Sequence, residues 1–276
     1  MPRVAELYIY PVKSLGGFAV DNAKLTDRGF QYDRRWMLVN DNNEFLTQRE
    51  FPQMALLQTA IASEGILVRH KNNSAENIRI PFTPPSDTTI NVKIWDDTCV
   101  ATPVSEEIDR WFSRMLEGKC KLVYMADDSL RKVDERYAIN KDDVTSFSDA
   151  YPILIIGEES LNDLNSRLEH PLPINRFRPN IVVSGTEPYE EDIMAEFKIN
   201  GVRFFGVKLC ARCPIPTIDQ DTIAKSKEPT KTLASYRKSG NNVYFGQNLL
   251  YEGAGTINRG DEIEIIKRKA TPVFNS

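Results

Sequence analysis

Hydrophobic and polar residues alternate over many short stretches of the chain, a pattern typical of β-strands. The stretch 4–12 alternates in this way and runs into a loop around Pro11 and Lys13. Short apolar runs predict further strands at 35–39, 55–61, 90–95, 121–125, 153–156, 181–183 and 262–266. So many short strands favour a mainly β fold, a barrel or sandwich with a few helices, over alternating βαβ units.

Two turn sequences predict hairpins. Asn200-Gly201 separates the apolar stretches 196–199 and 202–205, and both turn residues tolerate a positive φ, so we expect a tight hairpin there. The four polar residues 40–43 separate 35–39 from 44–47 and predict a second hairpin with a longer turn.

Helical periodicity appears in only a few places. Apolar residues at 108, 111, 112, 115 and 116 fall on one face of a predicted helix, with Ser105 as its N-cap and Gly118 at its C-terminal end. A second helix is predicted over 158–169, and a shorter helical turn after Pro229. The stretch 126–150 is polar and aperiodic, so we expect a long loop, and such loops are often functional.

Length and charge narrow the class of protein. A chain of 276 residues suggests one large domain or two modest ones, and we place the two at 1–120 and 121–276. The net charge of −4 gives no general attraction to nucleic acid or to a membrane surface, so neither is an expected partner. No apolar run approaches the ~20 residues of a membrane helix. With four cysteines and no targeting pattern at the N-terminus, we expect a cytoplasmic protein.

Cys210-Ala211-Arg212-Cys213 is the most informative tetrapeptide. Two structural thiols are one interpretation, because free cysteine behaves as a small hydrophobic residue. A thioredoxin-type pair is disfavoured, since the prolines that follow prevent the helix that this motif opens. Zinc and iron–sulfur sites lack further ligands, because the chain has no second CxxC and only two histidines. A single thiolate on a soft metal that is held mainly by another ligand stays open.

Cationic residues give a second signal. In the segment 175–180, alternation predicts that Arg176, Arg178 and Asn180 share one face of an extended strand while Phe177 lies on the other. Guanidinium groups on one face suit a planar or phosphorylated anion. The alternative is a pair of structural arginine–carboxylate bridges. Arg212 adds a third cation beside the cysteines.

The motifs of common hydrolases and nucleotide-binding proteins are missing. The sequence has no GxxxxGK[ST], GxGxxG, HExxH or GxSxG. A bound cofactor that carries the chemistry would explain why so few reactive groups are present.

Seven segments together carry a resemblance. They are YPVKS at 10–14, YDRRW at 32–36, SDAYP at 148–152, NRFRPNIVVSG at 175–185, LCARC at 209–213, KEPTKTLASYRK at 227–238 and FGQN at 245–248. In this order, and over nearly the full length, they resemble the MOSC superfamily, in its branch with an N-terminal MOSC β-barrel domain. The mitochondrial amidoxime reducing component and its bacterial homologues belong to this branch. The resemblance implies a MOSC N-terminal domain and a MOSC domain that hold a molybdenum cofactor between them.

The resemblance also implies a set of site residues. Cys213, not Cys210, is the expected molybdenum ligand, and we expect Asp149 to be a candidate for proton delivery. The expected cofactor-binding residues are Lys13, Ser14, Arg34, Asp149, Ala150, Tyr151, Arg178, Asn180, Ala211, Arg212, Cys213 and Asn248. Arg176 and Arg35 are left for salt bridges. Ala150, Tyr151 and Asn248 depart from the family pattern, so substrate preference stays open.

The resemblance predicts a molybdenum-cofactor oxidoreductase that reduces N-hydroxylated compounds such as amidoximes, hydroxylamines and N-hydroxylated bases. Without an iron–sulfur or flavin domain, its electrons would come from a separate ferredoxin-, flavodoxin- or cytochrome b5-like protein with its reductase. The alternative is a non-catalytic carrier of molybdenum cofactor or sulfur. Related domains end the cofactor sulfurases, whose pyridoxal-phosphate domain we do not find in this sequence, so pyridoxal phosphate is not expected to bind.

Overall fold

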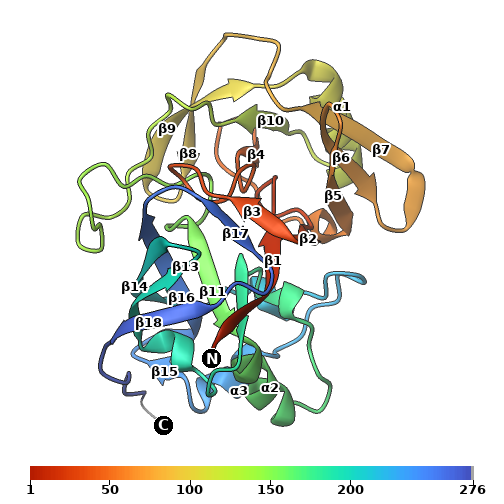
Figure 1. Cartoon of the computed structure of the whole chain (residues 1–276). Helices are drawn as coiled ribbons and strands as arrows, with labels where there is room; N and C mark the ends of the chain where they lie inside the picture. Colours follow the sequence, from red (N-terminus) through yellow and green to blue (C-terminus); the bar gives the residue numbers. More distant parts are fainter. Residues whose placement is uncertain (275–276) are drawn as a thin grey trace.

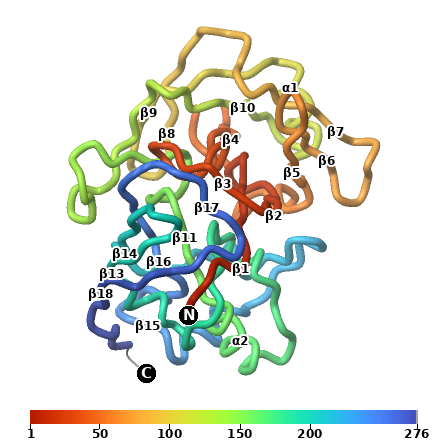
Figure 2. The backbone as a smooth tube through the Cα atoms, in the orientation of Figure 1, coloured from red at the N-terminus to blue at the C-terminus, as the bar shows by residue number. Residues whose placement is uncertain are grey.

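The protein folds into sheets that form an upper and a lower body, in the orientation of Figure 1. A computed structural model describes residues 1–274. The described part contains three α-helices against eighteen strands, which confirms the predicted mainly β fold with a few helices. The tube in Figure 2 shows that the start of the chain, in red, reaches down into the lower body beside the green and blue strands.

The largest sheet has nine strands and is antiparallel except where β11 and β12 run parallel. Its order is β18 (Ile263–Arg268), β13 (Met194–Ile199), β14 (Val202–Ala211), β16 (Asn242–Glu252), β11 (Ile153–Gly157), β12 (Ile181–Ser184), β1 (Arg3–Ile9) and β2 (Phe18–Val20), with β15 (Lys238–Ser239) paired to β16. The first 20 residues therefore supply two strands to a sheet that is otherwise built from the second half of the chain.

The remaining strands form three smaller sheets. One has the order β4 (Trp36–Val39), β10 (Lys121–Tyr124), β9 (Asp97–Pro103) and β8 (Ile90–Ile94). A three-stranded meander contains β5 (Leu57–Ala62), β6 (Gly65–His70) and β7 (Asn73–Pro81). A two-stranded ribbon joins β17 (Thr256–Asn258) to β3 (Asn22–Lys24), so it too links the two halves of the chain.

The three α-helices are α1 (Glu106–Leu116), α2 (Glu158–Ser166) and α3 (Thr230–Ala234). Ser105 caps α1 as predicted, because its side chain accepts a hydrogen bond from the Ile108 N–H. The left-handed residue at the end of α1 is Glu117 and not Gly118. Gly118 instead lies against the Phe51 ring, where a Cβ would come within 3.2 Å of a ring carbon.

Other local predictions were confirmed or corrected. The 196–205 hairpin forms, with positive φ at Asn200 and Gly201. The turn at 40–43 also forms, since the Asn40 N–H donates to the Glu44 carbonyl and the Leu46 N–H donates to the Leu38 carbonyl. The stretch 44–47, however, makes only isolated bridges and no regular strand. The helix predicted over 158–169 ends at Ser166, since the Asn165 side chain bonds to the backbone of Leu172 and turns the chain.

Two main cores lie on either side of the segment that follows β1. Val4, Leu7 and Ile9 belong to the core of the large sheet. Val12 and Leu15 belong to a second core with Trp36 and α1. Residues 10–15 therefore cross from one core to the other, which places Lys13 and Ser14 at the junction of the two bodies.

Candidate functional site

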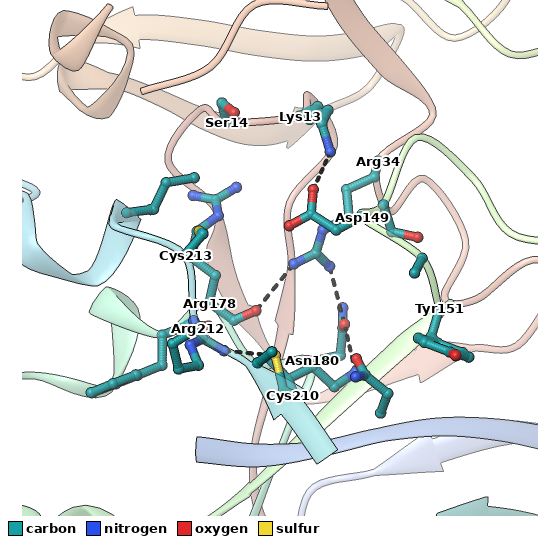
Figure 3. Close-up of a pocket in the computed structure, with 17 residues that line it drawn as sticks. Lys13, Ser14, Arg34, Asp149, Tyr151, Arg178, Asn180, Cys210, Arg212 and Cys213 are labelled. Carbon is teal, nitrogen blue, oxygen red and sulfur yellow. Dashed lines mark hydrogen bonds and ion pairs between the residues drawn. The ribbon is translucent and has the colours of Figure 1, made fainter. Parts of the chain in front are cut away.

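The crossing segment forms one wall of a pocket that encloses about 700 Å³ of empty space, part of it open to solvent. Every site residue predicted from the sequence lines it: Lys13, Ser14, Arg34, Asp149, Ala150, Tyr151, Arg178, Asn180, Ala211, Arg212, Cys213 and Asn248. Figure 3 shows Lys13 and Ser14 reaching in from one side, with the two cysteines and Arg212 on another wall.

Lys13 joins the crossing segment to the long loop. Its backbone N–H donates to the Trp36 carbonyl, and its ammonium donates to the Phe147 carbonyl (2.9 Å) and to Asp149 Oδ1 (2.6 Å). Burial lowers the pKa of Lys13, and Asp149 opposes that shift only in part. Ser14 follows with a φ of 67°, and its carbonyl accepts a hydrogen bond from Gln48. The chain is thus turned so that both residues line the pocket.

Arg34 is fixed from several directions. Its Nη1 donates to Asp33 Oδ2 (2.6 Å) and to Asn180 Oδ1 (3.0 Å), and its Nη2 donates to the Arg178 carbonyl. Burial alone would lower the pKa of Arg34, but the Asp33 carboxylate outweighs it and raises that pKa. Asn180, which also holds the backbone N–H of Leu154, ties this cation to the large sheet.

Arg178 is the least compensated cation of the pocket. Its side chain is nearly buried, its Nη1 donates to the Leu15 carbonyl (2.7 Å), and its Nη2 has no hydrogen-bond partner. No ion pair to a carboxylate is found for it among residues 1–274. Burial, with the nearby Arg34 charge, lowers the pKa of Arg178 to about 10. It is therefore still a cation at neutral pH, and one donor is free.

Tyr10 holds the two guanidinium groups beside each other. The carbon atoms of the Arg34 and Arg178 guanidiniums lie 4.7 and 4.3 Å from the centre of its ring. Such cation–π contacts stabilise cations at a desolvated site. Gly17 leaves room for the ring, because a Cβ at that position would meet it at 2.3 Å. The Tyr10 N–H also donates to Asp33, so one residue orients both arginines.

The cysteine motif begins in β14 and ends just beyond it. Arg212 is anchored by its backbone N–H to Val243 and by its Nη2 to the Phe177 carbonyl. Its Nη1 lies 3.1 Å from the Cys210 sulfur. Burial raises the pKa of the Cys210 thiol, although Arg212 opposes that shift. Cys213, the predicted ligand, follows the strand and is partly exposed in the pocket wall.

The opposite wall comes from the end of the long loop and from β16. The Asp149 side chain is 61% exposed, Ala150 is exposed, and Tyr151 is buried against Tyr137. Desolvation alone would raise the pKa of Asp149, but the Lys13 ammonium and then Arg34 outweigh it and hold that pKa below its usual value. Asn248 in β16 pairs with Leu154 of β11 and completes this wall.

The pocket carries an excess of positive charge. Its four cations, Lys13, Arg34, Arg178 and Arg212, face only two carboxylates, Asp33 and Asp149, which leaves two positive charges uncompensated. The unpartnered Arg178 Nη2 and Arg212 Nε are further donors for a ligand. Arginine and lysine donors in this number suit a phosphate group. In the described chain, no three His, Cys, Asp or Glu side chains gather as a metal site.

One prediction about this region was wrong. Arg176, Arg178 and Asn180 do not share the face of an extended strand, because Ile174–Arg176 is a 3-10 turn and Arg178 has a φ of 57°. The turn sends Arg176 away to Asp219 (2.9 Å), while Arg178 and Asn180 line the pocket. Arg176 and Arg35, which pairs with Asp127, therefore form the salt bridges that were left to them.

Several further residues of the pocket were not predicted as site residues. Five of them line it, namely Ser148, Leu154, Phe177, Cys210 and Ile215, and Tyr10 and Asp33 hold its arginines in place. Tyr10 and Asp33 stand inside the YPVKS and YDRRW segments, so the signal was present there. The apolar lining carried no such signal.

Comparisons with known proteins agree with this architecture. Residues 1–119 match the MOSC N-terminal beta barrel domain, and residues 142–264 match the MOSC domain. Mitochondrial amidoxime-reducing component 1 of Mus musculus is 33% identical, with 95% of this chain and 82% of that protein covered. The Homo sapiens protein of the same name is 31% identical over 95% and 82%. Molybdenum cofactor sulfurase of Oryza sativa subsp. japonica is 33% identical over 91% of this chain but only 32% of its own length.

The fold and the site thus define a β-rich protein with an anion pocket beside a pair of cysteines. The chain belongs to the MOSC-domain family, in the branch with an N-terminal MOSC β-barrel domain. Within residues 1–274, no helix is long and apolar enough to cross a membrane.

Proposed function

We propose that this protein binds a molybdenum cofactor and reduces N-hydroxylated compounds with electrons from a separate redox protein. The observation that carries the proposal is the pair of uncompensated positive charges in a pocket that also presents Cys213. The names of the amidoxime-reducing relatives support the reaction, and the sulfurase name supports the cofactor. The cytoplasmic location expected from the sequence stays a prediction.

The residues present fit a phosphorylated cofactor. Arg178 has a buried donor without a partner, and Arg212 has another, as expected of a site that is completed by an anion. Lys13, Ser14, Arg34, Arg178, Asn180 and Arg212 would hold the phosphate and the pterin, and the Cys213 thiolate would bind the metal. When bound, the cofactor supplies a two-electron redox centre, with a soft thiolate ligand that suits the metal.

The proposed reaction breaks the N–O bond of the substrate. Two electrons from the partner protein and two protons from solvent convert an N–OH group to N–H and one water. Asp149 is our candidate for moving a proton into the pocket, since its carboxylate is exposed at the wall. Because Lys13 lowers the pKa of Asp149, this side chain is ionised at neutral pH and must accept a proton before it passes one on. The electron donor would be ferredoxin-, flavodoxin- or cytochrome b5-like.

A carrier of molybdenum cofactor or sulfur is the second candidate. It is favoured by the match to a cofactor sulfurase, of which this chain covers about a third. Such a carrier needs the same anion pocket but no substrate turnover. Activity therefore separates the two functions, whereas cofactor content does not.

The test uses the two cysteines of one motif as a matched pair. Protein from a host that makes molybdenum cofactor is assayed for molybdenum per chain and for benzamidoxime reduction with a chemically reduced viologen. We expect about one molybdenum per chain in the wild type. Cys213→Ser should fold and lose turnover at least ~100-fold, because a hydroxyl is a poor ligand for a soft metal. Cys210→Ser should keep most of its molybdenum and activity.

Three outcomes would contradict parts of the proposal. Full activity in Cys213→Ser would exclude this thiolate as the ligand. Molybdenum without any reduction of benzamidoxime or hydroxylamine would favour the carrier. A protein that carries no molybdenum or pterin would contradict both functions.

A further inference from the structure

The tip of the β8–β9 hairpin, in the upper body, contacts Asp149 of the pocket wall. Ile94 pairs with Asp97, so the turn consists of Trp95 and Asp96. The Trp95 indole N–H lies 3.4 Å from Asp149 Oδ1, the carboxylate that lines the pocket and pairs with Lys13. The hairpin tip therefore stands at the rim of the candidate site, although it is 54 residues away from Asp149 in sequence.

Trp95 has an unusual backbone and an unusual exposure. Its φ is 55°, a left-handed conformation that is strained for a bulky aromatic residue. Strain of this kind persists where the surroundings enforce it, and it gathers at ligand sites. Trp95 is also 39% exposed, whereas the other two tryptophans, Trp36 and Trp111, are 0% and 6% exposed. The chain thus keeps its one exposed tryptophan on a strained turn at the rim of the pocket.

The neighbours of Trp95 hold its ring in place. The Arg49 guanidinium lies 4.5 Å from the ring centre, and the Phe45 ring is 5.0 Å away and tilted by 54°. Phe45 in turn lies 5.5 Å from the Lys13 ammonium, so the rim packs onto the ion pair of the pocket wall. Arg49 has no ion-pair partner in the described part of the chain, and its Nε donates only to the Thr47 hydroxyl. These contacts orient the ring, while Trp95 as a whole stays 39% exposed.

We propose that Trp95 is the specificity-determining residue of the pocket, a platform on which the planar aromatic part of a substrate stacks while its N–OH group enters. The inference rests on the proposed function, and it names aryl N-hydroxylated compounds as the preferred class. Stacking on an oriented ring favours a flat π system over a small aliphatic group, because only the former matches the ring in area and shape. Phe45 and Arg49 are positioning residues that hold the platform.

Two substrates with the same reacting group provide the kinetic test. Benzamidoxime has an aryl ring, and acetamidoxime has a methyl group in its place. In Trp95→Ala we expect kcat/KM for benzamidoxime to fall about tenfold, mainly through KM, and kcat/KM for acetamidoxime to change less than twofold. Trp95→Phe retains a ring and should recover most of the loss. Val100→Ala removes another exposed apolar side chain, 44% exposed on β9, and should behave as the wild type with both substrates.

Tryptophan fluorescence gives a second measurement that needs no turnover. Because Trp36 and Trp111 are buried, saturable quenching by benzamidoxime reports mainly on Trp95. We expect this quenching in the wild type and in Val100→Ala, and its loss in Trp95→Phe, with little quenching by acetamidoxime.

The possible outcomes distinguish the proposed role of Trp95 from the proposed reduction of N-hydroxylated compounds. Equal losses of kcat/KM for both substrates in Trp95→Ala, or no loss for either, would overturn the platform. Normal turnover without quenching in the wild type would also overturn it and leave the proposed function standing. Selective quenching without turnover of either substrate would support the platform and count against the proposed reaction.

Discussion

Two clusters of buried charged side chains, one around Arg237 and one in the pocket, differ in how their charges are balanced. Around Arg237, the guanidinium binds Asp192 at 2.5 Å with both side chains at most 5% exposed, and Glu191 adds a further buried acid. In the pocket, Arg178 brings a surplus cation. A buried carboxyl can become neutral by taking up a proton, but an arginine stays charged near neutral pH. The first cluster can therefore balance its charge by taking up a proton, whereas the excess positive charge of the pocket cannot be balanced in this way.

The largest expected loss of stability comes from removing Arg237 from its ion pair with Asp192. Arg237→Ala leaves Asp192 buried without its partner and removes the bond from Arg237 Nε to the Tyr244 carbonyl. We expect a loss of about 3–5 kcal/mol in the free energy of unfolding, measured by denaturant titration. The molybdenum content of the protein that still folds should match the wild type. A large loss of molybdenum in folded protein would show that the two clusters are not independent.

A smaller effect on stability is expected from replacing Glu191, the second buried acid beside Asp192. Burial and the nearby Asp192 charge raise the pKa of Glu191 to about 7. The folded protein therefore holds this proton more tightly than the unfolded chain, and the stability it contributes is fully present below about pH 4.5 and lost as the pH rises through about 7. Glu191→Gln should raise the free energy of unfolding at pH 8 by up to about 3 kcal/mol, with little gain at pH 4.5.

The control for this pH dependence is Glu264→Gln on β18, where the side chain is exposed. It should shift stability equally at both pH values. A gain in Glu191→Gln that does not depend on pH would mean that Glu191 is ionised throughout this range.

The smallest effect on stability is expected from replacing Arg178, the pocket cation without a carboxylate partner. Arg178→Ala loses the bond to the Leu15 carbonyl but also relieves the burial of a charge, so the unfolding free energy of the cofactor-free protein should change by less than about 1 kcal/mol. Its molybdenum content should nevertheless fall about tenfold, because a charged donor to the anion is lost.

Arg176→Ala, two residues away, is the matched control. Arg176 is already paired with Asp219, so its loss should lower stability without changing molybdenum content. If both variants lost molybdenum equally, charge balance would not distinguish a binding arginine from a structural one.

Local chemistry explains which parts of the fold could be predicted. The Asn200-Gly201 turn and the Ser105 cap are decided by residues within a few positions, and both formed as expected. Several strands were missed, β6, β7, β9 and β16 among them. In β7, the first five residues include no large apolar side chain, and apolar and polar residues alternate only over 77–80. The place of β1 beside β12 depends on contacts about 180 residues apart, which no local pattern encodes.

The candidate site was predictable for a different reason. The predicted site residues all lie in the motif segments, and the structure brings those residues together around one pocket. Their local conformation was less predictable, since Arg178 takes its left-handed backbone from packing around it and not from its own preference. The rim residue Trp95 lay outside every motif and became visible only through its neighbours.

The position of β1 has a consequence for the order of events during synthesis. β1 can pair with β12 only after residues 181–184 have been synthesised. The last residue of the pocket wall is Asn248, of 276 residues in the sequence. The pocket is therefore complete only once residue 248 has been synthesised. Residues 1–120 alone would contribute Lys13, Ser14 and Arg34 but neither the two cysteines nor Arg178 and Arg212, so neither half of the chain forms the pocket without the other.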